Sequence, residues 1–157
     1  MVEVRALLEY NAKIRRCYFD TLVKLPWEEF VKNREASWHS MRNIFIHTLG
    51  ATDHWLEFLQ NEKRSLRREF DDYKSIQDVQ TYMDRVEQRM GDYLNTLAPE
   101  RMNAKYVVTN DAGEKIEINT EDVLIHVFEE EVHHRGELIA LLWQINVEPP
   151  LMGWKYL

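Results

Sequence analysis

Two side chains late in the sequence have the types and spacing of metal ligands. Glu130 and His134 are four residues apart in a stretch with helical hydrophobic periodicity, so one helical turn brings a carboxylate and an imidazole to the same side. With about 100° per residue, the apolar residues of this stretch fall within about 40° of His134, and Glu130 falls at about -40°, on the edge of the same face. Those apolar residues are Val123, Val127, Leu138, Leu141 and Ile145. An unpaired charge on a buried face is costly, and a bound ion would compensate for it.

A third ligand would have to come from a facing helix, as it does in other metal-binding bundles. His47 lies in a second helical stretch beside Ile44, and Gly50 and Ala51 leave space on the same side. His54 lies on a similar side but nearer to solvent, so His47 is the better candidate. Two imidazoles and one carboxylate would hold three positions of a divalent ion and leave at least one for water or substrate. This ligand set suits Zn, Ni, Fe, Mn or Co, and ligand type does not choose among them.

Less specific interpretations of the same residues stay open. Glu130 and His134 could simply bond to each other on a half-buried face, which is the commoner outcome for an isolated pair of this spacing. His126 and His133 fall on the flank of the helix, where we expect them to lie beside the ligands rather than to be ligands.

None of the remaining polar residues of this stretch can be identified as a catalytic group. We expect Glu131 to face solvent or a neighbouring element. Arg135 could bind an anionic substrate or orient a ligand, but a surface salt bridge is the favoured interpretation. No separate general base is identifiable, so the catalytic residues stay unknown.

Four long stretches with helical periodicity position these residues. They run from about Val4 to Leu25, Ser40 to Gln60, Ser75 to Leu97 and Thr120 to Ile145. Ser37 and Ser40 are both suitable N-caps for the second helix, and Ser75 with Asp78 resembles a capping box for the third. A short helical turn is expected at 27–31.

In the connection before the last helix, the hydrophobic pattern changes from a helical period to that of a β-strand. Two short β-prone runs, 106–108 and 116–118, flank a turn-forming cluster at 110–113 and predict a small hairpin that packs on the bundle. This long connection permits a crossover. We predict an all-α fold, a four-helix bundle that forms a single domain over residues 1–157.

Composition excludes several classes of function. The net charge of -7 over 157 residues disfavours nucleic-acid binding, which needs a basic face. The basic cluster Lys63, Arg64, Arg67 and Arg68 is interspersed with acidic residues and reads as a solvated loop. No apolar run is long enough to span a membrane. The single cysteine, Cys17, and the absence of a signal-peptide pattern favour the cytoplasm.

Two segments resemble the DinB-like superfamily, the group of YfiT-like metal proteins. They are Asn43–His47 followed by Asp53–Leu56, and His126–Glu137 with its His-His-Arg-Gly run. The resemblance covers essentially the whole chain, and it implies a four-helix bundle of the DinB/YfiT type in which one metal is bound by three histidines. Carried onto this sequence, the ligand positions are His47, Glu130 and His134. This chain has glutamate at position 130, where the family usually has histidine, and Glu137, where it usually has glutamine.

The resemblance also implies a class of function. Some relatives of this fold are thiol-dependent S-transferases that use low-molecular-weight thiols such as bacillithiol or mycothiol, and others are described as metal-dependent hydrolases. We therefore expect a homodimeric, divalent-metal-binding transferase or hydrolase that acts on an electrophilic small molecule. The alternative is a non-catalytic, stress-related dimer that binds a metal or a small ligand.

Overall fold

A computed structural model of the chain describes residues 3–61, 69–110 and 112–153. The basic cluster Lys63, Arg64, Arg67 and Arg68 lies outside the described residues.

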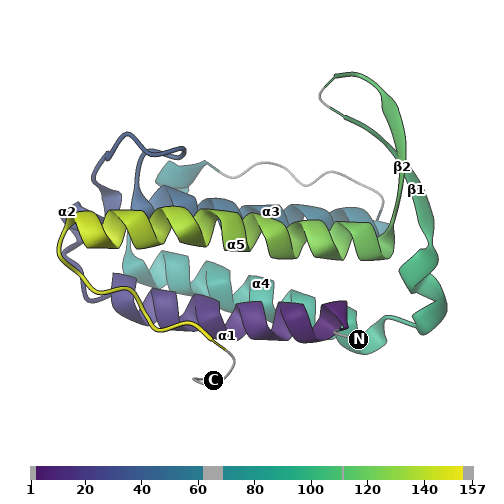
Figure 1. The fold of residues 1–157 in the computed structure, drawn as a ribbon, viewed down its shortest axis with the longest axis horizontal. Coiled ribbons are helices and arrows are strands. Elements are labelled where there is room, and N and C mark those ends of the chain that lie inside the picture. The colour runs from purple at the N-terminus through teal and green to yellow at the C-terminus, as the bar shows by residue number, and fades with distance from the viewer. Residues whose placement is uncertain (1–2, 62–68, 111, 154–157) are drawn as a thin grey trace.

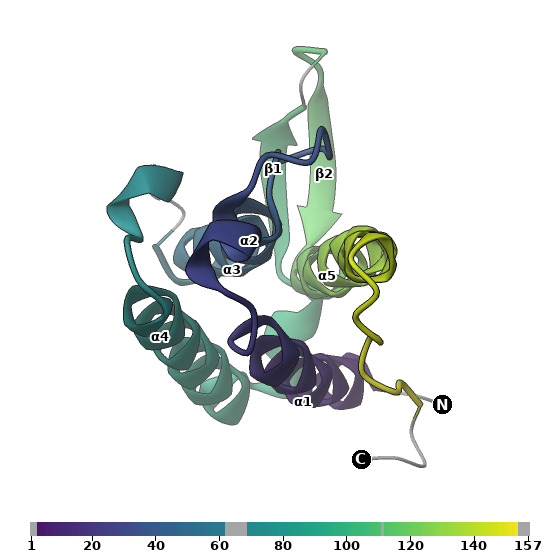
Figure 2. The same ribbon diagram turned by 90° about the vertical axis from the view of Figure 1, so that its left-hand side faces the viewer.

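The predicted four-helix bundle is confirmed. Its long helices are α1 (Val4–Leu22), α3 (Met41–Asn61), α4 (Ile76–Thr96) and α5 (Thr120–Gln144). The predicted turn at 27–31 is the short helix α2 (Trp27–Val31), and 3-10 turns occupy Phe70–Asp72 and Pro99–Asn103. The end-on view in Figure 2 shows α3 and α5 side by side above α1 and α4.

The direction of the helices differs from a simple up-down order. α1 and α5 run one way along the bundle, and α3 and α4 run the other way (Figure 1). The connection from α3 to α4 therefore joins opposite ends of the bundle. The connection before α5, where the sequence permits a crossover, joins helix ends at the same end of the bundle.

Local side-chain bonds set where the helices begin. Ser40, rather than Ser37, caps α3, because its hydroxyl accepts from the Asn43 N–H at 3.2 Å. Ser75 caps α4 and accepts from the Asp78 N–H, as predicted. α5 begins with a reciprocal capping box between Asn119 and Asp122. α1 ends at Leu22, three residues before the predicted end.

The predicted hairpin is also present. Strands β1 (Lys105–Thr109) and β2 (Lys115–Asn119) pair antiparallel, and Gly113 adopts a φ of 81° in the turn between them. The base of the hairpin packs on the bundle through Tyr106 and Ile118. The rest projects beyond the helices (Figure 1), and Val107 is 66% exposed.

The core consists of two hydrophobic clusters, one toward each end of the bundle. The cluster near α2 contains Ile14, Phe30 and Leu142, and the cluster near the hairpin contains Leu8, Leu56 and Leu124. α5 contributes to both. Among the described residues, no helix has the length and apolar character needed to cross a membrane.

Candidate metal centre

The structure brings His47 of α3 together with Glu130 and His134 of α5. One donor atom of each residue lies within 4.8 Å of the other two. Oε2 of Glu130 lies 3.4 Å from Nε2 of His47 and 3.6 Å from Nε2 of His134. The same carboxylate oxygen thus faces both imidazoles, and the i, i+4 spacing on α5 is what places two of the donors on one side.

The 3.4 Å contact between His47 and Glu130 is a long hydrogen bond, and both separations also fit a shared ion. A good N–H···O hydrogen bond spans about 2.7–3.2 Å, which is shorter than both distances. Two ligand atoms at about 2.1 Å from an ion in tetrahedral geometry are about 3.4 Å apart. Two nitrogens and one oxygen also form a donor set that divalent transition metals accept. The residues present therefore fit the metal that the resemblance implies.

The three side chains differ in how much of their surface is exposed to solvent. The His134 side chain is 7% exposed, whereas Glu130 and His47 are 29% and 23% exposed. This agrees with the helical positions expected from the sequence, with His134 on the buried face of α5 and Glu130 at its edge. One side of the group thus stays open to solvent, as a site that takes a substrate requires.

A carboxylate on the far side of His134 holds its second ring nitrogen. Oε2 of Glu137 lies 2.5 Å from His134 Nδ1 and accepts a 2.9 Å hydrogen bond from the Ser37 hydroxyl. Burial raises the pKa of the Glu137 carboxyl. The hydrogen bonds from His134 and Ser37, with the charges of His134 and His133, outweigh burial and hold this pKa below its ordinary value.

His47 is held from a different direction. The Trp38 ring stacks on the His47 ring at a centroid distance of 4.0 Å and an interplanar angle of 21°. Phe70 packs edge-on against the Trp38 ring, at a centroid distance of 5.8 Å. Ser37 and Trp38 are adjacent residues of the loop between α2 and α3, so one loop contacts both sides of the site.

His54, His126 and His133 do not belong to the group formed by His47, Glu130 and His134. His126 packs edge-on against Trp55 at 5.5 Å, and His54 contacts the same indole. His133 is exposed and lies edge-on to His134 at 4.9 Å. His133, His134 and Glu137 form a second group whose donor atoms also lie within 4.8 Å of one another.

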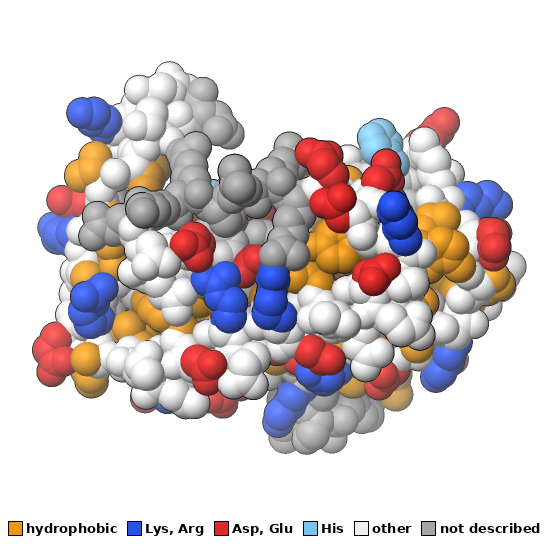
Figure 3. All heavy atoms as spheres, turned by 180° about the vertical axis from the view of Figure 1, so that it is seen from behind, with side chains coloured by type: hydrophobic (Ala, Val, Ile, Leu, Met, Phe, Trp, Pro, Cys, Tyr) orange, Lys and Arg blue, Asp and Glu red, His pale blue; other side chains and the backbone are white. Residues whose placement is uncertain are grey.

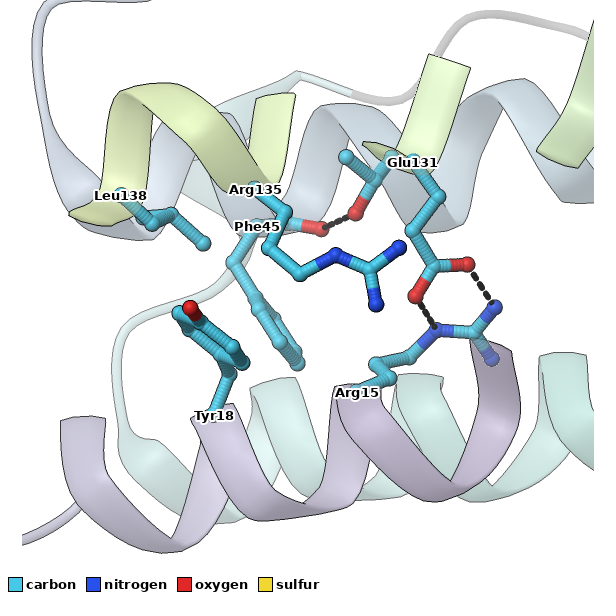
Figure 4. A pocket seen from close by; sticks show the side chains of 7 residues that line it. Arg15, Tyr18, Phe45, Glu131, Arg135 and Leu138 are labelled. Atoms are coloured by element: carbon cyan, nitrogen blue, oxygen red, sulfur yellow. Dashed lines mark hydrogen bonds and ion pairs between the residues drawn. The ribbon is translucent and has the colours of Figure 1, made fainter. Parts of the chain in front are cut away.

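Beside the candidate metal ligands on α5, two charged residues point into the bundle. Glu131 is 5% exposed and forms a bidentate pair with Arg15 of α1, at 3.0 and 2.6 Å (Figure 4). Arg135 is 7% exposed and donates to Asn11 Oδ1 at 2.7 Å. The surface salt bridge favoured for Arg135 is wrong, and Glu131 faces α1 rather than solvent.

These charged groups surround a small internal cavity. It measures about 20 Å³ and is lined by Arg15, Tyr18, Phe45, Thr48, Glu131, Arg135 and Leu138, which is enough for one water molecule. Burial raises the pKa of Tyr18 to about 12, against the opposing charge of Arg135. Nη1 of Arg135 has no hydrogen-bond partner within the described part of the chain. The layer beneath the site is therefore polar but closely packed.

The outer face of α3 and α4 carries a second charge network. Asp53 pairs with Arg85 at 3.0 Å and with Arg89, and Arg89 also reaches Glu57 at 3.0 Å. Figure 3 shows acidic and basic side chains intermixed over this face. The network links α3 to α4 at the surface.

Sequence reasoning missed the residues that support the site. Ser37 was considered only as a helix cap, and Trp38 was not singled out, because nothing in an irregular loop shows which helix it will contact. Glu137 had one available signal: it lies three residues after His134, a spacing at which helix side chains meet.

Comparisons with known proteins find a matching family and chains of similar sequence and fold. The model of the DinB family matches residues 1–155. The uncharacterized protein YizA of Bacillus subtilis (strain 168) is 23% identical over 141 residues, which cover 90% of this chain and 87% of YizA.

Two crystal structures share the fold. The DinB-like protein YjoA of Bacillus subtilis superposes with a TM-score of 0.64 at 14% identity, over 92% of this chain and 96% of that one. A DinB-like protein from Bacillus cereus ATCC 10987 superposes with a TM-score of 0.70 at 14% identity, over 95% and 97%. At these identities the likeness establishes the fold alone.

Proposed function

The chain belongs to the DinB family, and from this premise we propose that it binds one divalent metal ion through His47, Glu130 and His134 and acts as a metal-dependent transferase or hydrolase. The observation that carries the proposal is the position of Glu130 Oε2, which faces Nε2 of both histidines at 3.4 and 3.6 Å. These are the separations expected of atoms that share an ion.

The three ligands leave room for chemistry. His47, Glu130 and His134 would hold a divalent ion, which would lower the pKa of a water or thiol and so supply a nucleophile at neutral pH. His47 and Glu130 lie on the partly exposed side, so a substrate reaches the site from solvent. The glutamate adds one negative charge and a harder oxygen donor to the ligand set. We propose a low-molecular-weight thiol and an electrophilic small molecule as the substrates.

The non-catalytic alternative is a bundle that binds a metal or a small ligand without turnover. The two proposals differ in whether the open side of the site supports a reaction. An activity screen that combines low-molecular-weight thiols with electrophilic acceptors distinguishes them. Activity that disappears on chelation and returns with added metal supports the enzyme, and activity indifferent to chelation contradicts it.

Metal content tests the site directly. Protein purified without added metal, and protein stripped and then reloaded with Zn²⁺ or Mn²⁺, should hold about one ion per chain. His47→Ala and His134→Ala should each lose most of that ion, because each leaves only two donors. His126→Ala, which removes a neighbouring histidine outside the group, is the matched control. Equal metal in the wild type and in His134→Ala, with both folded by circular dichroism, would sink the proposal.

We also propose that two copies associate through the outer face of α5. Ile125, Val132 and Trp143 are 40%, 44% and 57% exposed there, and their spacings of seven and eleven residues place them on one stripe. An exposed apolar stripe of this kind marks an interaction surface. The single cysteine is consistent with a reducing compartment, and we propose a cytoplasmic location.

A further inference from the structure

We infer that the loop between α2 and α3 positions both ligand histidines before an ion binds, with Ser37 acting on His134 through Glu137 and Trp38 acting directly on His47. The inference rests on the proposed metal site and concerns how that site is pre-organised. Ser37, Trp38 and Glu137 are positioning residues: each acts on a ligand and none is itself counted among the three donors.

The first arm of this arrangement fixes the proton on His134. The Glu137 carboxylate lies 2.5 Å from Nδ1, and a carboxylate can only accept there, so Nδ1 carries the hydrogen. In the neutral imidazole the lone pair is then on Nε2, the nitrogen that faces Glu130 Oε2 at 3.6 Å. Metal-ligating histidines in proteins are typically oriented by such a bond at the other ring nitrogen.

Ser37 fixes the carboxylate in turn. Its hydroxyl donates to the same Glu137 oxygen at 2.9 Å, which holds that oxygen toward the imidazole. The two residues are 100 positions apart in the sequence, so this bond ties the loop to α5. Without it, Glu137 is free to turn toward solvent, because its side chain is 26% exposed.

The second arm restrains the ring of His47. An indole stacked at 4.0 Å and 21° blocks one face of the imidazole and hinders its rotation. The rings of His47 and His134 then meet edge-on at a centroid distance of 4.7 Å. Since Ser37 and Trp38 are consecutive, a single loop conformation serves both histidines.

The loop itself is strongly constrained. The Arg34 N–H donates to the His39 carbonyl at 2.6 Å, and the His39 N–H donates to the Ala36 carbonyl at 2.9 Å. Glu35 and His39 have left-handed φ values of 56° and 70°, which are uncommon for residues other than glycine. The Arg34 guanidinium bonds the Glu29 carboxylate of α2. The fold therefore sets the loop conformation, and an ion does not need to create it.

Pre-organisation of this kind should raise the affinity of the site for a metal ion. Ligand side chains that are already oriented lose less freedom on binding. Removing an outer partner of a ligating histidine typically weakens metal binding by about 10–100-fold. We expect Glu137→Ala to fall in that range and Ser37→Ala and Trp38→Ala to weaken binding less. Glu137→Gln keeps an acceptor for Nδ1–H and should recover much of the loss.

The experiment measures Zn²⁺ affinity by competition with a chelator, for the wild type and these variants. Glu129→Ala, at an exposed residue of α5, is the matched control. In parallel, long-range ¹H–¹⁵N NMR of the metal-free protein reports the His134 tautomer. If Glu137 served only to stabilise the fold, replacing it would not change this tautomer. We expect the Nδ1–H form in the wild type and in Glu137→Gln, and its loss in Glu137→Ala.

The outcomes separate the two proposals. A wild type that binds no Zn²⁺ overturns the metal site itself. A wild type that binds, with Glu137→Ala, Ser37→Ala and Trp38→Ala binding equally well, overturns the positioning inference and leaves the site intact. Loss of a second ion in Glu137→Ala at unchanged affinity for the first means that Glu137 is a ligand, and it also overturns the inference. If Glu137→Ala does not fold, Ser37→Ala and Trp38→Ala, which leave Glu137 in place, still test the inference.

Discussion

Arg15 and Glu131 form a buried ion pair, but replacing Arg15 should destabilise the fold more than replacing Glu131. Glu131 contacts only Arg15 among the charged groups of the described residues, whereas Arg15 also reaches Glu87 at 3.4 Å. Arg15→Met therefore leaves Glu131 without a charge partner in a position that is 5% exposed. Glu131→Gln leaves the Arg15 guanidinium with one carboxylate and a neutral acceptor.

The expected magnitudes follow from this asymmetry. Breaking a buried ion pair by removing one partner costs about 3–5 kcal/mol, and we expect Arg15→Met to lie in that range. For a chain of this length that corresponds to a fall in Tm of roughly 6–20 °C. Glu131→Gln should cost about 2 kcal/mol, the usual worth of a hydrogen bond to a charged group. The double variant Arg15→Met/Glu131→Leu should return to within about 2 kcal/mol of the wild type, because neither charge is left buried.

Urea unfolding followed by circular dichroism measures these differences, and equal m-values would show that the unfolded states are comparable. The double variant should be more stable than the sum of Arg15→Met and a single Glu131→Leu predicts, which is the sign of direct coupling. Two results would refute the reasoning: additive losses in the double variant, or an Arg15→Met loss under about 1 kcal/mol. Either would mean that the pair behaves like a solvent-screened surface pair.

Three further changes have defined outcomes. Ser75→Ala removes the side-chain cap of α4 and should lower the free energy of unfolding by about 1 kcal/mol in urea titrations, with metal content unchanged. The pKa of Asp78 is lowered by its hydrogen bonds from the Ser75 side chain and the Lys74 backbone N–H. This carboxylate therefore stabilises the fold above its unfolded pKa, and the contribution is lost as pH falls through the lowered value, so Asp78→Asn should flatten the acid side of a Tm-against-pH curve. Val132→Glu places a charge in the exposed stripe of α5 and should shift the protein from dimer to monomer in light scattering, with no change in Tm beyond that of dissociation. A wild type that is already monomeric contradicts the proposed dimer.

Helical periodicity was enough to predict how the site residues of α5 are arranged. A spacing of four residues on α5 is enough to align Glu130 with His134, and the apolar pattern indicates that His134 is the more buried of the two. Both features depend only on the geometry of one helix. The fold class could be predicted for the same reason, because four long amphipathic stretches have few ways to bury their apolar faces.

The parts that could not be predicted depend on contacts between distant elements. Arg135 and Asn11 are 124 residues apart, and Arg15 and Glu131 are 116 apart. Neither α1 nor α5 has a pattern that identifies the other as its partner. α5 also carries apolar residues on its outer face, such as Val132, so its own sequence does not define where the buried face ends. An arginine in such a stretch is ordinarily at the surface. That expectation is wrong for Arg15 and Arg135, because each has a buried hydrogen-bond partner on another helix.

α5 follows all of its packing partners in the chain, and this order has a consequence for synthesis. Leu142 belongs to one hydrophobic cluster and Leu124 to the other, so both clusters have an open side until α5 has been made. During translation, α1, α3 and α4 emerge with apolar faces uncovered and with Arg15 lacking Glu131. Chains in that condition are prone to aggregation and are what chaperones bind. The protein should therefore become protease-resistant late and in one step, once α5 has left the ribosome.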